Sequence, residues 1–364
     1  MRVLYFYPEE NPMIASHVDM LCSNMPSYVE TNRATEGKNA ITLLKSGTYD
    51  LVHLHGCWRN STRTVVNTAM KYGTRLIITP HGELQPWVQQ QNRWKEKMPK
   101  RIAYQQRIVE KAYAVIIQGK MEEECMERLG WNPRCAIIRN SVITRSITPK
   151  DMAAQTYALY RKVMDSNPLE LMTDDQQAML KDIITVGITG DPQWLTTQHL
   201  MTLENEEWRR MLCYVEQEYI SDTFKRGVRV LRVEPADIQI DPSLCFVPPG
   251  YEVPSTIEHA IGNQWVSEND RLVASFKYLK KQISTKRLAM LHLVELDKEL
   301  RHHPCDEDKL CETLHEQGLY RLATRLMQLM SDKTGLTEGF MPMPPLNDRT
   351  TKRMRIQVEN RMSI

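Results

Sequence analysis

The chain has 364 residues, with 47 lysines and arginines against 45 aspartates and glutamates, so its formal net charge at pH 7 is only +2. A dedicated nucleic-acid-binding protein needs a clear basic excess for its phosphate contacts, and this balance argues against one. Hydrophobic residues make up 41% of the chain, which is enough for a real core, and no apolar run approaches the roughly 20 residues that span a bilayer.

The eight cysteines follow no repeating spacing, and the N-terminal run 1–7 is too short and too aromatic for a secretion signal. These features predict a cytoplasmic protein with reduced thiols. The 21 methionines, which oxidise readily, agree with a reducing compartment. The length allows two modest domains or one large one.

The first 148 residues alternate strand and helix signals. Apolar runs at 2–7, 51–55, 75–79, 114–118 and 136–138 are separated by helical spacing at 61–72, 102–112 and 121–129. Strands that are apolar throughout, with helices between them, are typical of a parallel sheet covered on both faces. The pattern predicts an α/β, Rossmann-like doubly wound domain over 1–148. Only about 45 residues separate the first strand from Leu51, so the second strand of such a domain is expected to be missing.

The second part of the chain, 149–335, is predicted to be a mainly helical domain. Helical patterns cover 152–164, 173–186, 204–224, 268–300 and 310–330, and the one clear strand pattern is Val-Arg-Val-Leu-Arg-Val at 228–233. Five prolines within 234–254 predict a segment that wraps the surface. Residues 336–364 form a proline-containing basic tail. A frayed terminus is the favoured interpretation of this tail, with a docking arm and a short basic helix as alternatives.

Two strand ends carry the clearest functional signal. Leu-Val-His-Leu-His-Gly ends at Gly56, and Thr-Pro-His-Gly-Glu covers 79–83, so each apolar strand stops at a His-Gly pair. In an open parallel sheet, ligands bind at the carboxyl ends of the strands, near the point where the strand order reverses. Glycine also lets the backbone approach a ligand closely. We therefore expect the two His-Gly pairs to lie side by side at a ligand-binding edge.

These motifs, taken in order with segments 86–87, 110–112, 123–130 and 137–142, resemble the N-terminal acceptor-binding domain of family 4-like glycosyltransferases of the B-type fold. The resemblance covers about the first 145 residues. It implies transfer of a sugar from a nucleotide-sugar co-substrate to a glycan or glycolipid acceptor, as in polysaccharide biosynthesis, without a metal or another cofactor.

The resemblance also implies roles for the residues of the two motifs. His81 would lie in the cleft near the reacting centre, where a neutral imidazole can donate to a sugar oxygen without adding charge. The alternative for His81 is a hydrogen bond to the backbone at the strand end. His55, Gly56 and Gly82 would bind substrate beside it, whereas His53 is expected to be a buried strand residue.

Three further residues follow the motifs. Trp58 and Trp87 offer aromatic faces that either stack on sugar rings or pack in the core. Glu83 is either a base for the acceptor or a partner of a neighbouring backbone amide, and the second interpretation is favoured. All three are predicted substrate-binding residues.

Arg93, Lys95 and Lys97 belong to a basic cluster that continues to Arg101. This cluster either contacts anionic lipid or a phosphate-bearing acceptor, or is the solvated start of a helix. The first alternative predicts peripheral contact with the inner face of the membrane.

The second domain of the resembled enzymes, which binds the nucleotide-sugar, has no clear counterpart here. The nearest similarities are Val-Gly-Ile-Thr-Gly-Asp at 186–191 and Thr-Glu-Gly-Phe at 337–340. A catalytically inactive binding or scaffold protein is therefore an alternative, as is the acceptor subunit of a two-chain transferase with a partner glycosyltransferase chain.

The chain contains no motif typical of a nucleotide hydrolase, a dinucleotide oxidoreductase or a serine hydrolase. One group of residues has a metal-like composition: His302, His303, Cys305, Cys311 and His315. It lacks the paired spacing of zinc sites, so no metal site is predicted.

Overall fold

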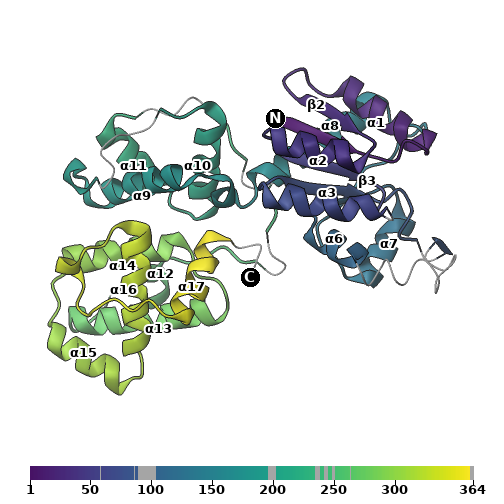
Figure 1. The fold of residues 1–364 in the computed structure, drawn as a ribbon. Coiled ribbons are helices and arrows are strands. Elements are labelled where there is room, and N and C mark those ends of the chain that lie inside the picture. The colour runs from purple at the N-terminus through teal and green to yellow at the C-terminus, as the bar shows by residue number, and fades with distance from the viewer. Residues whose placement is uncertain are drawn as a thin grey trace. The chain divides into compact units, whose positions relative to one another are not determined.

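A computed structural model describes residues 1–57, 59–85, 87–88, 104–195, 202–233, 238–241, 245–247, 251–262 and 264–360. The chain forms two compact units, Met1–Met164 and Asp165–Ile364 (Figure 1). The boundary lies 16 residues later than the sequence-based boundary at 148, because helix α8 (Pro149–Asp165) lies almost entirely in the first unit.

The first unit is built on one six-stranded sheet in which every strand pair is parallel. The strand order is β2-β1-β3-β4-β5-β6, with β2 on one side of β1 and β3 on the other. The order therefore reverses between β1 and β3, as in doubly wound sheets. The strands are β1 (Arg2–Phe6), β2 (Glu30–Ala34), β3 (Leu51–His55), β4 (Arg75–Thr79), β5 (Ala114–Ile117) and β6 (Cys135–Ile137). The predicted α/β class is confirmed.

The expectation that the second strand is missing was wrong. β2 has the sequence Glu-Thr-Asn-Arg-Ala and pairs with β1 from Arg2↔Glu30 to Phe6↔Ala34. It is an edge strand, and only Ala34 is buried. An edge strand does not need a continuous apolar run, so a search for such runs misses it.

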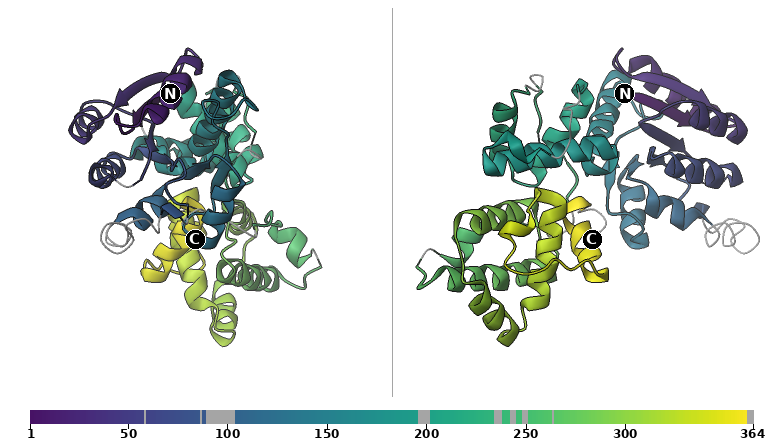
Figure 2. Two further views of the ribbon diagram at one scale, coloured as in Figure 1. Left: turned by 90° about the vertical axis from the view of Figure 1, so that its right-hand side faces the viewer. Right: turned by 60° about the vertical axis from the view of Figure 1, so that its left-hand side comes forward.

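Helices cover both faces of this sheet (Figures 1 and 2). Leu4, Phe6, Val52 and Leu54 point to one face and share a hydrophobic core with residues of α2 and α3. The helices of the unit are α1 (Pro12–Asn24), α2 (Gly37–Ser46), α3 (Asn60–Lys71), α6 (Gln106–Lys111), α7 (Lys120–Leu129) and α8. Because side chains alternate along a strand, Tyr5, His53 and His55 point to the opposite face, toward α1 and α8.

The described part of the second unit contains helices and no strand. Its helices are α9 (Asp174–Thr189), α10 (Asn205–Gln217), α11 (Ser221–Leu231), α12 (Ile257–Ile261), α13 (Glu268–Ser284), α14 (Met290–His302), α15 (Glu307–Glu316), α16 (Tyr320–Thr334) and α17 (Arg349–Glu359), with short 3₁₀ turns η3 (Pro168–Leu171), η4 (Pro192–Trp194) and η6 (Glu338–Phe340). The predicted helical C-terminal region is confirmed.

The two helices that the sequence predicts as long, 204–224 and 268–300, are each divided in two, and 310–330, where one or two helices are expected, also forms two. Near each break a residue adopts a left-handed backbone conformation: Tyr219 after α10, Lys286 after α13 and Gly318 after α15. The expected strand at 228–233 was also wrong, because most of it lies in α11. Alternating valine and arginine imitate a half-buried strand, but Phe224 and Val228 are four residues apart and share the buried face of a helix.

Two glycines lie where α9 and α11 cross. A Cβ atom added to Gly187 would lie 2.0 Å from the carbonyl oxygen of Thr223, and one added to Gly227 would lie 2.0 Å from that of Ile183. The backbones therefore approach as closely as glycine permits. Gly187 had resembled the opening of a donor domain, but it lies inside α9, and Gly190 ends that helix in a left-handed conformation.

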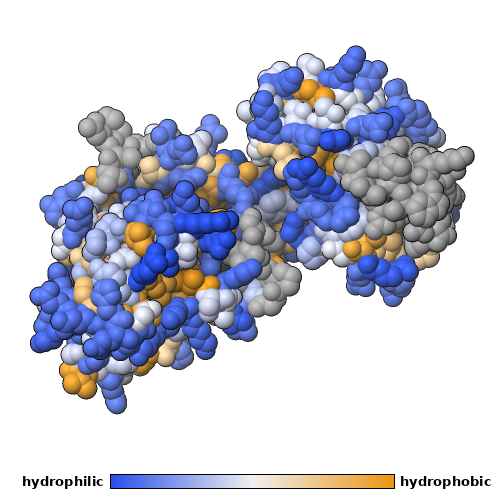
Figure 3. All heavy atoms as spheres, turned by 60° about the horizontal axis from the view of Figure 1, so that its bottom comes forward, coloured by the Kyte–Doolittle hydropathy of each residue, from blue (hydrophilic) through white to orange (hydrophobic). Residues whose placement is uncertain are grey.

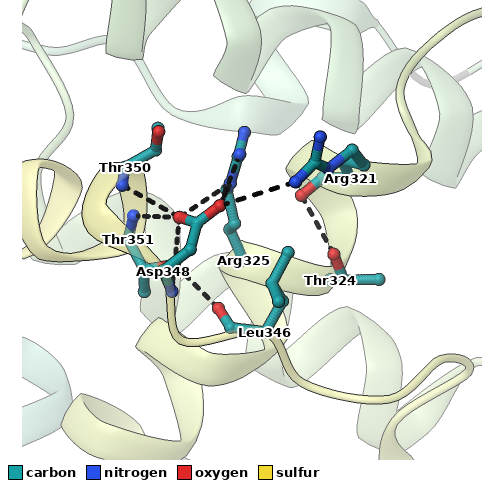
Figure 4. Close-up of polar contacts among 7 residues, drawn as sticks. All are labelled: Arg321, Thr324, Arg325, Leu346, Asp348, Thr350 and Thr351. Carbon is teal, nitrogen blue, oxygen red and sulfur yellow. Dashed lines mark hydrogen bonds and ion pairs between the residues drawn. The ribbon is translucent and has the colours of Figure 1, made fainter.

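The C-terminal segment is ordered as α17 through residue 359, so the expected frayed terminus was wrong. Asp348 caps the helix by accepting from the backbone amides of Thr350 (2.9 Å) and Thr351 (3.0 Å) (Figure 4). The same carboxylate accepts from the guanidinium of Arg325 on α16, with the shorter distance at 2.6 Å. Met354 is only 1% exposed, so α17 closes the core of its unit.

Replacing Asp348 by alanine removes the cap of α17 and its ion pair with Arg325 together. We expect a lower melting temperature and faster proteolytic removal of residues 349–364. Asp348→Asn is the matched control, because asparagine is also a good cap but carries no charge. A smaller drop in melting temperature for Asp348→Asn than for Asp348→Ala would separate the contribution of the cap from that of the ion pair. An unchanged melting temperature in both variants would contradict the stabilising role of Asp348.

None of the helices in the described ranges is long and apolar enough to cross a membrane. In the view of Figure 3, the exposed face of each unit is mostly hydrophilic and carries only small hydrophobic patches. Apolar atoms contribute much of the surface of any folded protein, so small exposed patches are normal.

Candidate functional site

The two His-Gly pairs meet at the carboxyl edge of the sheet. His55 is the last residue of β3, and the Gly56 amide donates to the carbonyl oxygen of Thr79 at the end of β4 (2.9 Å). His81 then adopts a left-handed conformation with φ of 53°, which turns the chain back. The turn places Nε2 of His81 2.9 Å from Nδ1 of His55.

Two more histidines extend this pair into a cluster. His53 lies two residues before His55 on the same face of β3, and its ring centroid is 4.1 Å from that of His55. His17 comes from α1, and its ring centroid lies 5.4 Å from that of His55 and 5.1 Å from that of His81. Sequence reasoning missed His17. The available signal was a histidine on the apolar face of the helix that follows the first strand, in line with Ile14 and Leu21.

His53 is held in a fully buried hydrogen-bond chain. Tyr160 of α8 donates to the Tyr5 hydroxyl (3.1 Å), so it accepts from Nδ1–H of His53 (2.6 Å). Nε2 of His53 then accepts from the hydroxyl of Thr79 (2.7 Å). Both ring nitrogens of His53 therefore have hydrogen-bond partners within the protein. His53 is a buried strand residue, as expected from the sequence, and it stabilises this edge of the sheet.

A second chain fixes the tautomers of the other pair. The side-chain amide of Gln118, just after β5, donates to Nδ1 of His81 (2.9 Å). The proton of His81 is therefore on Nε2 and is donated to Nδ1 of His55, which leaves the His55 proton on Nε2. That nitrogen and Nδ1 of His17 are buried, and neither has a hydrogen-bond partner among the described residues.

Burial keeps these imidazoles neutral. It lowers the pKa of His81 to about 3 and the pKa of His53 and His55 well below the ordinary value, with the neighbouring rings acting in the same direction. Burial also lowers the pKa of His17, and a hydrogen bond with the Asn140 side chain partly opposes this. At neutral pH each ring therefore carries one N–H donor and one lone pair and no charge.

Glu83 organises the backbone of this edge. Its carboxylate accepts from the Cys57 amide (2.5 Å), which is the kind of role that the sequence favoured. Gly56 has a φ of 82°, and a Cβ atom there would lie 3.1 Å from the Glu83 carboxylate. Glycine at 56 therefore provides both the conformation and the space for this contact.

Glu122, in the first turn of α7, was not predicted. It accepts from the amides of Gly82 and Gln118, the latter at 2.7 Å, and so joins the His81 turn to the end of β5. Burial raises its pKa, and the two amide bonds partly oppose this. The acidic first turn of α7 was visible in the sequence, but the partner amides were not.

A cavity of about 600 Å³ opens beside His81. Its wall combines the His81 turn, the start of α7 and the loop after β6. The lining residues are His81, Gly82, Gln85, Gln118, Gly119, Lys120, Met121, Glu122, Arg139, Asn140, Ile143 and Thr144. The cations Lys120 and Arg139 give part of this wall an affinity for negatively charged groups.

Other predicted site residues are not brought into this cluster by any described contact. The Trp87 side chain is 48% exposed. In the metal-like group near α15, Cys311 donates to the carbonyl oxygen of Pro342 and His315 stacks on Tyr320. Four predicted residues lie outside the described ones: Trp58, Arg93, Lys95 and Lys97.

The fold and this edge define a Rossmann-like α/β unit with a cluster of polar side chains beside its strand-order reversal. Residues 25–141 match the family model of the glycosyl transferase 4-like domain. The first unit therefore contains a glycosyltransferase family 4-like domain, and the match includes both His-Gly pairs and Glu122. Searches of curated proteins and of solved structures found no match for the chain.

Proposed function

We propose that the protein is a divergent glycosyltransferase that transfers a sugar from a nucleotide-sugar donor to a glycan or glycolipid acceptor in cytoplasmic polysaccharide biosynthesis. The observation that carries the proposal is the neutral His55–His81 pair beside the strand-order reversal of a family 4-like domain. The cavity beside His81 supplies room for a ligand.

The chemistry of the edge suits a sugar. A hydroxyl both donates and accepts, and a neutral imidazole supplies the same two functions without a charge. His81 is the proposed catalytic residue, acting on an oxygen near the reacting centre. His55, Gly56, Gly82, Glu83 and the two tryptophans Trp58 and Trp87 remain the proposed substrate-binding residues.

The cavity wall also suits a phosphate-bearing substrate. Lys120 and Arg139 line it, and phosphate oxygens are strong acceptors for such side chains. Arg93, Lys95 and Lys97 are the proposed further contacts for an anionic acceptor or for the inner face of the membrane.

The helical second unit favours a second candidate function. A donor domain of the resembled enzymes would be a second strand–helix domain, and the described part of residues 165–364 contains no strand. The alternative is therefore a binding or scaffold protein, or an acceptor subunit whose partner chain supplies the donor domain.

Nucleotide binding tests the single-chain enzyme. A thermal-shift screen of the full chain with uridine, guanosine, adenosine and cytidine diphosphates should raise the melting temperature with one of them, because a ligand at 100 times its Kd stabilises the native state by about 2.7 kcal/mol. No shift with any of the four would favour the alternative function.

His81→Ala then tests the assigned residue in the presence of the nucleotide-sugar that binds. We expect release of the nucleoside diphosphate to fall by about 10²-fold or more, the usual effect of losing an acid–base group. His259→Ala, on the surface helix α12, is the matched control and should keep full turnover. Unchanged turnover in His81→Ala would remove His81 from the mechanism.

A further inference from the structure

His17, His55 and His81 form a three-imidazole cluster from three separate elements. Each ring offers one nitrogen such that the three nitrogens all lie within 4.8 Å of one another. The ring centroids form a nearly equilateral triangle with sides of 5.4, 5.1 and 5.2 Å. Among the residues that the structure describes, this is the group of histidine, cysteine and acidic side chains with the spacing of metal ligands.

The unused ring nitrogens indicate that the cluster lacks a component. His17 is 4% exposed and His55 is 2% exposed, yet Nδ1 of His17 and Nε2 of His55 have no hydrogen-bond partner in the part of the chain that the structure describes. A buried polar atom without a partner costs about 1–3 kcal/mol, so native proteins seldom leave two of them together. A metal ion bound by three imidazoles takes one ring lone pair from each, so it would replace the hydrogen bond between His81 and His55.

The donor set selects the kind of ion. Neutral imidazoles suit zinc, copper and nickel, whereas calcium and magnesium prefer oxygen ligands. Three histidines with a fourth, open position are a common zinc set. We propose that His17, His55 and His81 bind a first-row transition-metal dication, with Zn²⁺ as the first candidate.

The surroundings support this assignment. Ligating histidines are commonly oriented by a hydrogen bond to their second nitrogen. The Gln118 side chain hydrogen-bonds to Nδ1 of His81 and so directs Nε2 of that ring toward the other two, and the Asn140 side chain hydrogen-bonds to the His17 ring. With a metal ion on Nε2, the His81 proton lies on Nδ1 and is donated to the Gln118 side-chain carbonyl. Spacing within the chain could not reveal the site, because its three members lie on α1, at the end of β3 and after β4.

Metal binding requires only small movements of the rings. Nitrogens bound tetrahedrally to one zinc ion at about 2.0–2.1 Å lie about 3.3 Å apart. Nδ1 of His55 and Nε2 of His81 are already 2.9 Å apart, and rotation of the rings brings the three nitrogens to this spacing at the expense of that hydrogen bond. The inference goes beyond sugar transfer and does not depend on it.

The test is metal binding by the untagged full chain after treatment with a chelator. Titration with Co²⁺ should give visible d–d absorption that saturates at one equivalent, and Zn²⁺ should displace it. His17→Ala should weaken Zn²⁺ binding by more than about 100-fold, since loss of an outer-shell partner alone costs 10–100-fold. His259→Ala is the matched control and should bind as the unaltered chain does.

Circular dichroism checks that His17→Ala folds. If it does not, Gln118→Ala replaces it, with an expected loss of about 10–100-fold in Zn²⁺ affinity. Absence of stoichiometric Co²⁺ and Zn²⁺ binding, or equal binding by the unaltered chain and the folded variant, would overturn the inference. Metal binding without any nucleotide binding would leave it standing while removing the single-chain enzyme.

Discussion

Replacing Gly227 by alanine should destabilise the helical unit by about 3 kcal/mol or more. The added Cβ atom would lie 2.0 Å from the carbonyl oxygen of Ile183, 2.9 Å from its carbonyl carbon and 3.1 Å from the Gly187 amide nitrogen. All three are backbone atoms of one helix, so no side-chain rotation relieves the overlap. Overpacking costs typically 1–3 kcal/mol where side chains can adjust, and a backbone obstacle places this site at the upper end.

Urea denaturation followed by circular dichroism measures the loss. Gly339→Ala is the matched control, because Gly339 is exposed and an added Cβ atom there meets nothing within 4 Å. The control should unfold at nearly the same urea concentration as the unaltered chain. If Gly227→Ala also did so, the close crossing of α9 and α11 would be refuted.

Acidification should destabilise the sheet unit strongly below pH 6.5, in metal-free protein. The folded state holds the His81 ring neutral down to a pKa of about 3, and it lowers the pKa of His53 and His55 well below the ordinary 6.5. The unfolded state therefore binds more protons than the folded state below pH 6.5, and stability falls as the pH falls. At pH 5 each such ring lowers the free energy of unfolding by about 2 kcal/mol relative to neutral pH.

The other titratable groups around the cluster modify this total. Tyr5 and Tyr160 have raised pKa values and stay neutral throughout this range. The pKa of Glu122 is also raised, so its protonation favours the folded state in acid and offsets part of the loss. The three buried rings together still lower the free energy of unfolding by several kcal/mol in acid. This is a large share of the roughly 5–15 kcal/mol by which a domain is usually stable.

Urea denaturation between pH 5 and pH 7.5 measures this dependence. His81→Asn is the matched variant, because asparagine tolerates the left-handed conformation at position 81 and does not titrate. Its stability should change by about 1.4 kcal/mol less per pH unit, which corresponds to one proton. An identical slope in the two proteins would show that His81 is not buried as a neutral ring.

The parts of the fold with a continuous apolar signal could be predicted from the sequence. The four runs ending at Phe6, His55, Thr79 and Ile117 are central strands, buried on both faces, so periodicity finds them. β2 could not be predicted in this way, because it is an edge strand with mostly polar, solvated side chains. The region 228–233 misled because the same alternation of valine and arginine fits a helix once Phe224 and Val228 supply its buried face.

The candidate site divides in the same way. His55 and His81 could be paired from the sequence, because each ends a strand and parallel strands share one carboxyl edge. His17 and Glu122 lie on helices, and their partners depend on how those helices pack. Such contacts join residues 38 to 40 positions apart through three-dimensional arrangement alone, as between Gly82 and Glu122.

The contact between Tyr160 and His53 has a consequence for how such proteins can diverge. Tyr160 lies beyond the last strand, on α8, but it completes the buried hydrogen-bond chain beneath the histidine cluster. Recombination that joined a new C-terminal half at residue 148 would remove that hydroxyl and leave a buried imidazole nitrogen without its acceptor. The module that evolution can exchange therefore begins after Met164, and a lineage that replaced its second domain would inherit α8 together with the sheet.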